Sequence, residues 1–185
     1  MSSQPLFRAE VDVLGRPFHA IWTPEDGALR AAGFATAADP AADSLVERLA
    51  RLDPGLAARG FAPDASGSSP VVSSLRAYAA GDLRAIDGLI VAQPGSPFRA
   101  EVWQALRRVP AGGTVTYTAL ASLAGRPKAV RAAASACANN LIALVVPCHR
   151  IVRSDGGLGG YLFGTEVKER LLSHEGAGAQ QALFG

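Results

Sequence analysis

The stretch Leu141-Ile142-Ala143-Leu144-Val145-Val146-Pro147-Cys148-His149-Arg150 places an apolar run directly before a proline, a cysteine, a histidine and an arginine. A short apolar run bounded by turn residues predicts a buried strand. Buried strands continue into loops, and loops often carry binding and catalytic side chains. We therefore expect a thiol, an imidazole and a guanidinium to emerge together at the end of a buried strand.

Around this stretch, the second half of the chain is predicted to be mostly helical. Ser96-Pro97 is typical of a helix start, with an N-cap followed by proline at the first helical position. Two short helices are expected over 118–124 and 128–138, and their connection through a glycine makes them a helix-turn-helix candidate. A glycine-rich loop at 156–164 then leads to a final helix over 165–173.

The first third of the chain is predicted to form a small antiparallel sheet with helices. Strand candidates cover 6–13, 18–23 and 29–34, and the segments between them contain glycine and proline, which favour turns. A helix is expected from Ser44, because Glu47 completes a capping box with it, and a second one over 73–80.

These elements predict two domains. Gln93-Pro94-Gly95 has the composition of a linker. We expect an α/β N-terminal domain over 1–92 and a mostly α C-terminal domain over 93–185 that contains the helix-turn-helix.

Composition excludes several classes of protein. The 185 residues are 49% hydrophobic and 18% charged, which is ample for a packed core, and the net charge of +2 does not by itself indicate a polyanionic partner. Two cysteines are unlike a secreted disulfide framework. The polar start of the chain and its lack of an apolar run approaching about 20 residues give no sign of a membrane span. We expect a cytoplasmic protein.

Cys148 is the first candidate for chemistry, although most free cysteines are small buried hydrophobes. Adjacent side chains on an extended segment point to opposite faces, so Cys148 and His149 cannot face each other as in a thiol protease. Either the backbone turns sharply here, or a water molecule links sulfur to imidazole. A third group would orient the imidazole, and Glu175 is a candidate; its alternative is a solvated terminal carboxylate.

The helix over 127–138 is nearly free of long side chains. Such a helix either packs closely in a core or presents a face that approaches a nucleic-acid groove, with Lys128 and Arg131 projecting from one side. Tyr117, between two threonines at the start of the preceding helix, is either a phosphate partner or a half-buried tyrosine. Cys137 is expected to be a core thiol, and the sequence holds no ligand set for a metal.

Residues 146–152 closely resemble the active-site signature of the O6-alkylguanine-DNA alkyltransferases. The resemblance is dense over roughly residues 96–175 and is loose before them. Further matching segments are Phe98–Trp103, Thr114–Tyr117, Leu120-Ala121, Pro127–Ala132, Asn140, Gly159-Gly160-Tyr161, Lys168 and Leu171-Leu172.

The resemblance implies a DNA-repair protein, each molecule of which reacts only once. Such proteins bind duplex DNA through the minor groove with a helix-turn-helix and flip an O6-alkylated guanine into a pocket. Cys148 would take the alkyl group in one in-line displacement without being regenerated. His149 would act as its base through a bridging water, Glu175 would orient His149, and Asn140 would hold the turn between the recognition helix and the active-site strand.

The same resemblance implies the surfaces that meet the substrate. Arg131 would fill the space left by the flipped base, and Tyr117 would press on the phosphate and donate a hydrogen bond to the leaving guanine. The implied DNA-binding residues are Tyr117, Arg131, Thr116, Lys128, Ala132 and Ala138. The implied pocket residues are Tyr117, Cys137, Val145, Gly159, Gly160, Tyr161 and Leu162. The small side chains of the helix suit a minor groove about 6 Å wide.

Alkylated double-stranded DNA is the expected partner of a monomer that could bind cooperatively, with no cofactor and no metal. O4-alkylthymine is a further candidate substrate. Leu162 and Phe163 stand where some relatives carry smaller or hydroxyl side chains, which predicts a pocket roof that is tighter or more apolar. Two alternatives stay open. A non-catalytic binder of alkylated DNA would lack the cysteine, and a thiol hydrolase would turn over repeatedly.

Overall fold

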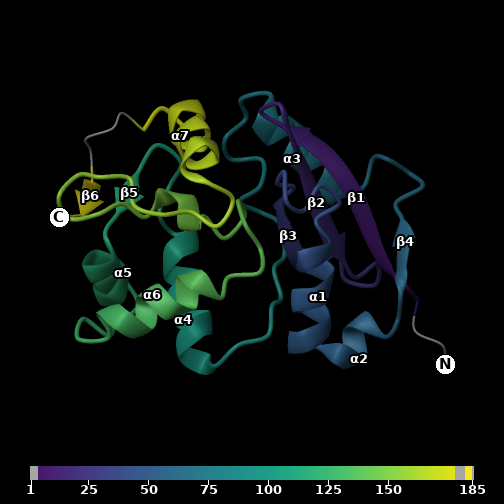
Figure 1. Cartoon of the computed structure of the whole chain (residues 1–185), viewed down its shortest axis with the longest axis horizontal. Helices are drawn as coiled ribbons and strands as arrows, with labels where there is room; N and C mark the ends of the chain where they lie inside the picture. Colours follow the sequence, from purple (N-terminus) through teal and green to yellow (C-terminus); the bar gives the residue numbers. More distant parts are fainter. Residues whose placement is uncertain (1–3, 178–181, 185) are drawn as a thin grey trace. The chain divides into compact units, whose positions relative to one another are not determined.

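A computed structural model of the chain describes residues 4–177 and 182–184 (Figure 1). It contains two compact units. The first unit runs up to Pro94 and also includes Leu141–Val145, and the second includes Gly95–Asn140 and the residues from Val146 onwards. The segment 141–145 thus groups with the first unit although it lies far along the chain. The division at 92/93 into separate domains stays a prediction.

The first unit is built on a four-stranded sheet in the order β3-β2-β1-β4. β1 and β2 are antiparallel, as are β2 and β3, but β4 is parallel to β1. The sheet is therefore mixed, whereas the sequence predicted an antiparallel one, because the chain passes through helices before β4 returns beside β1. The strands are β1 (Leu6–Val13), β2 (Arg16–Trp22), β3 (Leu29–Phe34) and β4 (Phe61–Pro63).

Three helices belong to the first unit: α1 (Asp43–Leu52), α2 (Pro54–Ala57) and α3 (Pro70–Ala79). The predicted capping box at Ser44 is wrong, because the carboxylate of Asp39 accepts hydrogen bonds from the backbone N–H groups of Asp43 (2.7 Å) and Ser44 (3.1 Å). α3 also begins earlier than predicted, since the Ser69 side chain accepts a hydrogen bond from Val72 N–H.

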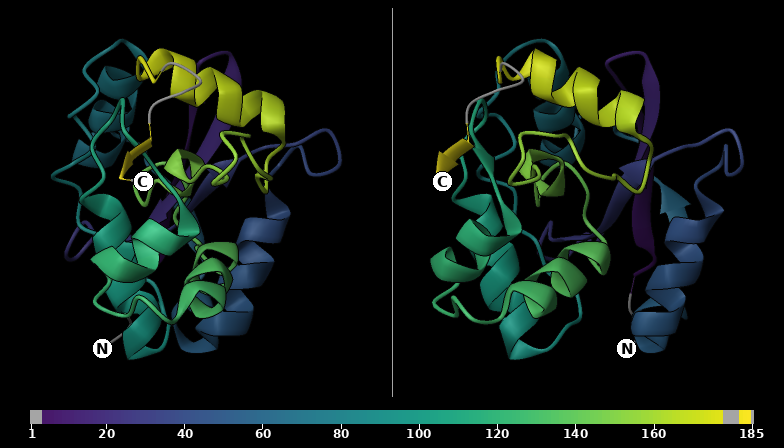
Figure 2. Two further views of the ribbon diagram at one scale, coloured as in Figure 1. Left: turned by 90° about the vertical axis from the view of Figure 1, so that its left-hand side faces the viewer. Right: turned by 60° about the vertical axis from the view of Figure 1, so that its left-hand side comes forward.

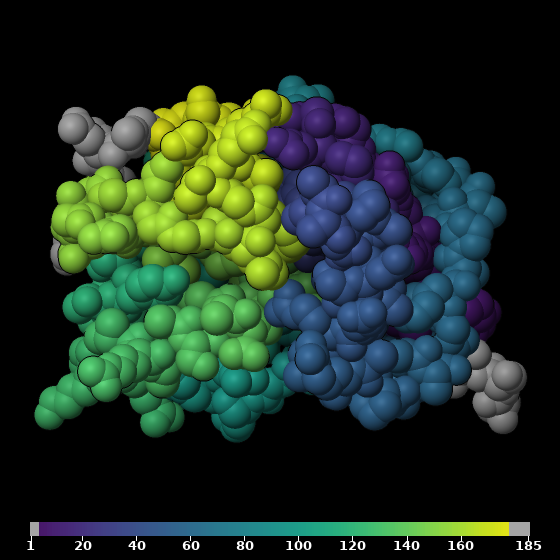
Figure 3. Space-filling view, viewed as in Figure 1, coloured from purple at the N-terminus to yellow at the C-terminus, as the bar shows by residue number. Residues whose placement is uncertain are grey.

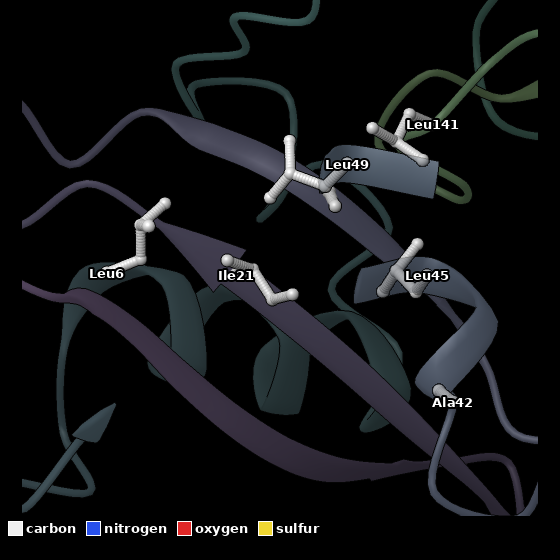
Figure 4. Close-up of a cluster of buried hydrophobic side chains, with 7 residues drawn as sticks. Leu6, Ile21, Ala42, Leu45, Leu49 and Leu141 are labelled. Carbon is white, nitrogen blue, oxygen red and sulfur yellow. The ribbon is translucent and has the colours of Figure 1, made fainter. Parts of the chain in front are cut away.

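Helices cover both faces of this sheet (Figure 1). β2 accordingly has five consecutive buried residues, from Phe18 to Trp22, in place of a strict alternation. On one face, leucines of α1 and residues of β1 and β2 form a fully apolar cluster (Figure 4). Its members are Leu6, Ile21, Ala31, Ala42, Leu45, Leu49 and Leu141. Leu141 belongs to this core and therefore fixes the start of the segment that leads to Cys148.

The second unit is mostly helical. α4, α5 and α6 contact one another, and α5 and α6 lie side by side (Figure 2). Ser96 caps α4 as predicted, since its hydroxyl accepts a hydrogen bond from Arg99 N–H. The elements are α4 (Pro97–Arg107), β5 (Thr114–Val115), α5 (Tyr117–Leu123), α6 (Val130–Ala138), the 3-10 helix η1 (Cys148–Arg150), α7 (Thr165–His174) and β6 (Ala182–Phe184), which pairs in parallel with β5. Among the described residues, no helix has the length and apolar character that crossing a membrane requires.

The predicted strand over 141–146 is wrong, although its burial was predicted correctly. All six residues are buried, but only Ile142 bridges to a strand residue, Ala32. The backbone then turns, with Leu144 in the left-handed region at φ 68°. An apolar run specifies burial without specifying the pairing partner, and here the edge of the sheet accepts only one residue of the run.

Candidate active site

η1 turns the backbone sharply at the residues of the signature. The Cys148 N–H donates to Val146 O at 2.9 Å, and the Arg150 N–H donates to Pro147 O at 3.0 Å. The sequence left open either a sharp turn of the backbone or a water molecule between sulfur and imidazole, and the structure shows the sharp turn. Cys148 is partly exposed, whereas His149 (0% exposed) and Arg150 (3%) are buried behind it. The thiol therefore faces accessible space while its neighbours form a buried support.

The support is a hydrogen-bonded cluster of His149, Arg150 and Glu175. His149 Nε2 lies 2.9 Å from Glu175 Oε1. Arg150 donates to both carboxylate oxygens, from Nε to Oε2 at 3.0 Å and from Nη2 to Oε1 at 2.9 Å. Glu175 is only 4% exposed, so it is not the solvated terminal carboxylate that the sequence alone favoured.

The protonation states follow from burial and these contacts. Burial alone would raise the pKa of Glu175, but its hydrogen bonds and attraction to His149 and Arg150 outweigh burial and lower that pKa well below its usual range. Burial lowers the pKa of His149, against the opposing effect of Glu175. We therefore assign a neutral imidazole that donates from Nε2–H to an ionised Glu175.

This assignment leaves the lone pair of His149 on Nδ1. Nδ1 is buried and makes no hydrogen bond to the described residues. An imidazole nitrogen that carries a lone pair and whose opposite nitrogen is fixed by a carboxylate is suited to be a general base. The cluster can therefore accept a proton at Nδ1 and stabilise the resulting imidazolium through Glu175.

Asn140 connects the end of α6 to the cysteine turn. Its Nδ2 donates to Val146 O at 2.9 Å and lies 3.4 Å from Cys148 Sγ. A single amide thus fixes the backbone just before the turn and offers a donor to sulfur. Negative charge developing on the sulfur would be favoured by this donor.

Lys168 was missed as a site residue, although it stands within the matching sequence. Its Nζ donates to the backbone carbonyls of Ile151 (2.5 Å), Leu158 and Gly160 (3.4 Å), and the side chain is 2% exposed. A lysine at an apolar position of α7, directly after buried Val167, was the signal that could have identified it. Through these hydrogen bonds, Lys168 connects the glycine-rich loop to the residue that follows η1.

Replacing Lys168 with methionine should leave the buried carbonyl group of Ile151 and the partly buried carbonyl groups of Leu158 and Gly160 without their donor. We expect the free energy of unfolding to fall by about 2–3 kcal/mol, because each unsatisfied buried group carries a desolvation penalty. Urea unfolding measures the change. The exposed Lys128 gives the matched control, and Lys128→Met should stay within about 0.5 kcal/mol of the wild type. An equal effect of the two substitutions would contradict the role of Lys168.

Four of the predicted pocket residues, Gly159, Gly160, Tyr161 and Leu162, lie in the glycine-rich loop. The ring of Tyr161 lies edge-to-face with that of His149, with centroids 6.5 Å apart, and with that of Phe163 at 5.4 Å. Gly159 has φ 70°, a backbone conformation that favours glycine. Leu162 is 65% exposed, and Gly160 is also exposed. Val145 is buried in the segment that groups with the first unit.

The two cysteines have different environments. Cys137 is buried in α6, and burial, followed by the influence of Cys148, raises the pKa of its thiol to about 12. Cys148 is partly exposed. Neither of them forms a disulfide in this structure. Cys137 is the core thiol that the sequence predicted.

Only Cys148 should therefore react with a thiol reagent in the native protein. At pH 8 a thiol with a pKa of about 12 is thiolate in roughly one molecule in 10⁴. Mass spectrometry of peptides after brief treatment with iodoacetamide should show the adduct on Cys148, and denatured protein should label on both cysteines. Equal labelling of Cys137 in folded protein would contradict the difference in burial.

The predicted DNA-binding residues lie on α5, α6 and the segment between them. Tyr117 opens α5 and is 39% exposed, and burial of the remainder raises the pKa of its hydroxyl. Thr116 caps α5, because its hydroxyl accepts a hydrogen bond from Ala119 N–H at 3.1 Å. Its side chain is buried, so a direct contact of the Thr116 hydroxyl with DNA stays a prediction. The segment near residues 125–131 projects from the surface (Figure 3).

One face of α6 is exposed and carries almost only small side chains. Trp103 holds the opposite face, since its Nε1 donates to Ala136 O at 2.9 Å. α6 begins at Val130, two residues later than predicted, and no side chain caps its N-terminus. The exposed residues of the helix are Arg131, Ala132, Ser135 and Ala138.

Among the described residues, no group of three or more histidine, cysteine or acidic side chains is arranged to hold a metal ion. A cavity of about 500 Å³ in the first unit is lined by Arg8, Glu10, His19, Pro40 and their neighbours. It contains none of the signature residues.

In fold, the chain is similar to the crystal structure of the Mycobacterium tuberculosis protein OGT in complex with DNA, with 27% identity, a TM-score of 0.70, and coverage of 92% of this chain and 93% of that one. Residues 97–177 match the family model described as 6-O-methylguanine DNA methyltransferase, DNA binding domain. The family model thus covers the C-terminal region of the chain, and the resemblance seen in the sequence is confirmed.

Curated relatives match the same region. The methylated-DNA–protein-cysteine methyltransferase of Salmonella typhimurium is 50% identical over 99 residues, which are 54% of this chain and 58% of that protein. The bifunctional transcriptional activator/DNA repair enzyme Ada of Escherichia coli is 56% identical over 81 residues, which are 44% of this chain and 23% of that protein. The chain thus matches less than two thirds of the length of either relative.

Proposed function

We propose that this chain repairs alkylated DNA by transferring an alkyl group from O6 of guanine to its own Cys148, once per molecule. The observation that carries the proposal is the partly exposed Cys148 in front of the buried cluster of His149, Glu175 and Arg150. The names of the relatives support the same reaction, since they describe cysteine methyltransferases for methylated DNA.

The first step would make the sulfur nucleophilic. The thiolate is the reactive form of cysteine, so the proton on Cys148 Sγ must leave. His149 Nδ1 is the base that the cluster provides, and a bridging water would carry the proton from sulfur to nitrogen. The imidazolium that forms would be stabilised by Glu175, which lies 2.9 Å from Nε2.

The second step would be an in-line displacement at the alkyl carbon. The bond from Sγ to carbon forms as the bond from carbon to guanine O6 breaks, and the electron pair of the broken bond stays with guanine. The proton taken from the thiol balances that charge, and Tyr117 would donate a hydrogen bond to the leaving base. The product is a thioether on Cys148.

DNA would be bound by α5 and α6 acting as a helix-turn-helix. The exposed face of α6 carries small side chains, which permit close approach to a minor groove about 6 Å wide. The exposed Lys128 and the N-terminus of α6, which no side chain caps, would both favour phosphate. Arg131 would enter the stack as the damaged guanine flips out. The protein would act as a cytoplasmic monomer, with O4-alkylthymine as a second candidate lesion.

A titration tests this proposal against a thiol hydrolase. Limiting protein is mixed with excess duplex that contains O6-methylguanine, and the restored guanine is measured. We expect a plateau at one guanine per protein molecule. Continued release of methyl beyond that plateau would show turnover and would overturn the proposal.

Replacing Arg131 with alanine should slow repair of duplex DNA by about 10- to 100-fold, because no side chain would fill the space of the flipped base. The free base O6-methylguanine, which needs no flipping, should react at nearly the wild-type rate. The two rates, measured in parallel, separate base flipping from chemistry. Equal losses with both substrates would contradict this role of Arg131.

A further inference from the structure

Arg150 is held in the buried cluster by hydrogen bonds from three of its nitrogens. It donates to both oxygens of Glu175 and, from Nη1, to Val109 O at 2.6 Å. The residue is 3% exposed, so none of these contacts is shared with bulk solvent. A planar guanidinium with contacts on three nitrogens has a single orientation available.

The charges of the cluster balance only when Arg150 is present. Arg150 carries one positive charge, Glu175 carries one negative charge, and His149 is neutral. Oε1 of Glu175 accepts from both His149 Nε2 and Arg150 Nη2, each at 2.9 Å. The carboxylate can therefore serve the imidazole as an acceptor because the guanidinium compensates its charge.

We infer that Arg150 is a positioning residue: it keeps Glu175 ionised and thereby holds His149 with its proton on Nε2 and its lone pair on Nδ1. The value of this arrangement for catalysis rests on the proposed function. The arrangement itself is a property of the free protein and can be measured without DNA.

Loss of the positive charge would reverse the state of Nδ1. Without Arg150, the buried pair of Glu175 and His149 would carry a net negative charge and would take up a proton. If the imidazole holds that proton, both of its nitrogens are protonated. If Glu175 holds one and donates it to Nε2, the imidazole keeps its other proton on Nδ1. In either case the base at Nδ1 is lost.

Other charged groups that act on His149 do not replace Arg150. Lys168 on α7 acts on the imidazole in the same direction as Arg150, but its Nζ is engaged with the carbonyls of Ile151, Leu158 and Gly160. Of the two cations Arg150 and Lys168, Arg150 is the one that donates to Glu175 in the described structure.

The test is the tautomer of His149, observed by NMR in ¹⁵N-histidine-labelled protein without DNA. The wild type should show a protonated Nε2 and a lone pair on Nδ1. Arg150→Met should show a protonated Nδ1, and Arg150→Gln should do the same if the methionine variant does not fold. Arg150→Lys keeps the charge and should keep the wild-type tautomer. Arg170→Met on the exposed side of α7 is the matched control and should leave the tautomer unchanged.

Single-turnover rates at saturating methylated DNA complete the test. The neutral variants should transfer the methyl group at least about 100-fold more slowly, while their affinity for DNA stays within about twofold of the wild type. A folded neutral variant that retains the lone pair on Nδ1 would overturn the inference, as would a wild type with its proton on Nδ1. The expected tautomers without any methyl transfer in the wild type would instead refute the proposed function and leave the role of Arg150 intact.

Discussion

Replacing Cys148 with serine should abolish alkyl transfer while leaving the fold and DNA binding unchanged. A serine hydroxyl is a far weaker nucleophile than a thiolate, and the buried cluster would remove its proton much less readily than the proton of a thiol. We expect the rate of methyl transfer to fall by at least about 10³-fold. Transfer is measured with duplex DNA that carries a radiolabelled methyl group on O6 of guanine.

Compared with the wild type, the serine variant also distinguishes a repair protein from a non-catalytic binder of alkylated DNA. The thermal midpoint and the affinity for duplex DNA serve as controls, because Cys148 is only partly buried and serine is close to it in size. Unchanged DNA binding with no transfer is expected for a repair protein that has lost its acceptor. Transfer at the wild-type rate would mean that another residue accepts the methyl group.

Replacing Glu175 with glutamine should damage both stability and chemistry. The guanidinium of Arg150 would lose the carboxylate that it contacts through Nε and Nη2, and a buried unpaired charge costs about 3–5 kcal/mol. The imidazolium of His149 would also lose its counter-charge, so methyl transfer should slow by about 10²- to 10⁴-fold. Urea unfolding and single-turnover kinetics measure the two effects. Glu169→Gln at an exposed position of α7 is the control.

The same residue sets a direction for the effect of pH. The pKa of Glu175 is lowered in the folded state, so its stabilising effect is complete above about pH 4.3 and is lost as the pH falls toward the folded value. The pKa of buried His149 is also lowered, so stability begins to fall below about pH 6.5. Glu175→Gln should lack the more acidic loss. A wild type that gains stability between pH 6 and pH 4 would contradict these assignments.

The sequence predicted those parts of the fold that depend on local patterns. β1 and β3 have the predicted bounds because turn residues mark their ends, and Ser96-Pro97 marks the start of α4. β4 could not be predicted, because it is a three-residue strand near a loop rich in proline and serine. Its position is set by pairing with β1, which is a long-range contact.

The candidate site was predictable only in part for the same reason. Cys148 and His149 are adjacent in sequence, and their geometry could be limited to two arrangements. The burial of Glu175 could not be inferred, because its partners lie 25 and 26 residues earlier in the chain. Arg150 is adjacent to His149 in the sequence, but its spacing did not indicate a bidentate contact with the carboxylate of Glu175, which follows α7.

The central claim is that Cys148 itself receives the alkyl group and keeps it. Wild-type protein is incubated with an equimolar amount of duplex DNA that contains O6-methylguanine, and the intact mass and the peptide masses are measured. The account predicts a gain of one methyl group, located on the peptide that contains Cys148 and stable over time. An unchanged protein mass accompanied by restored guanine would contradict it.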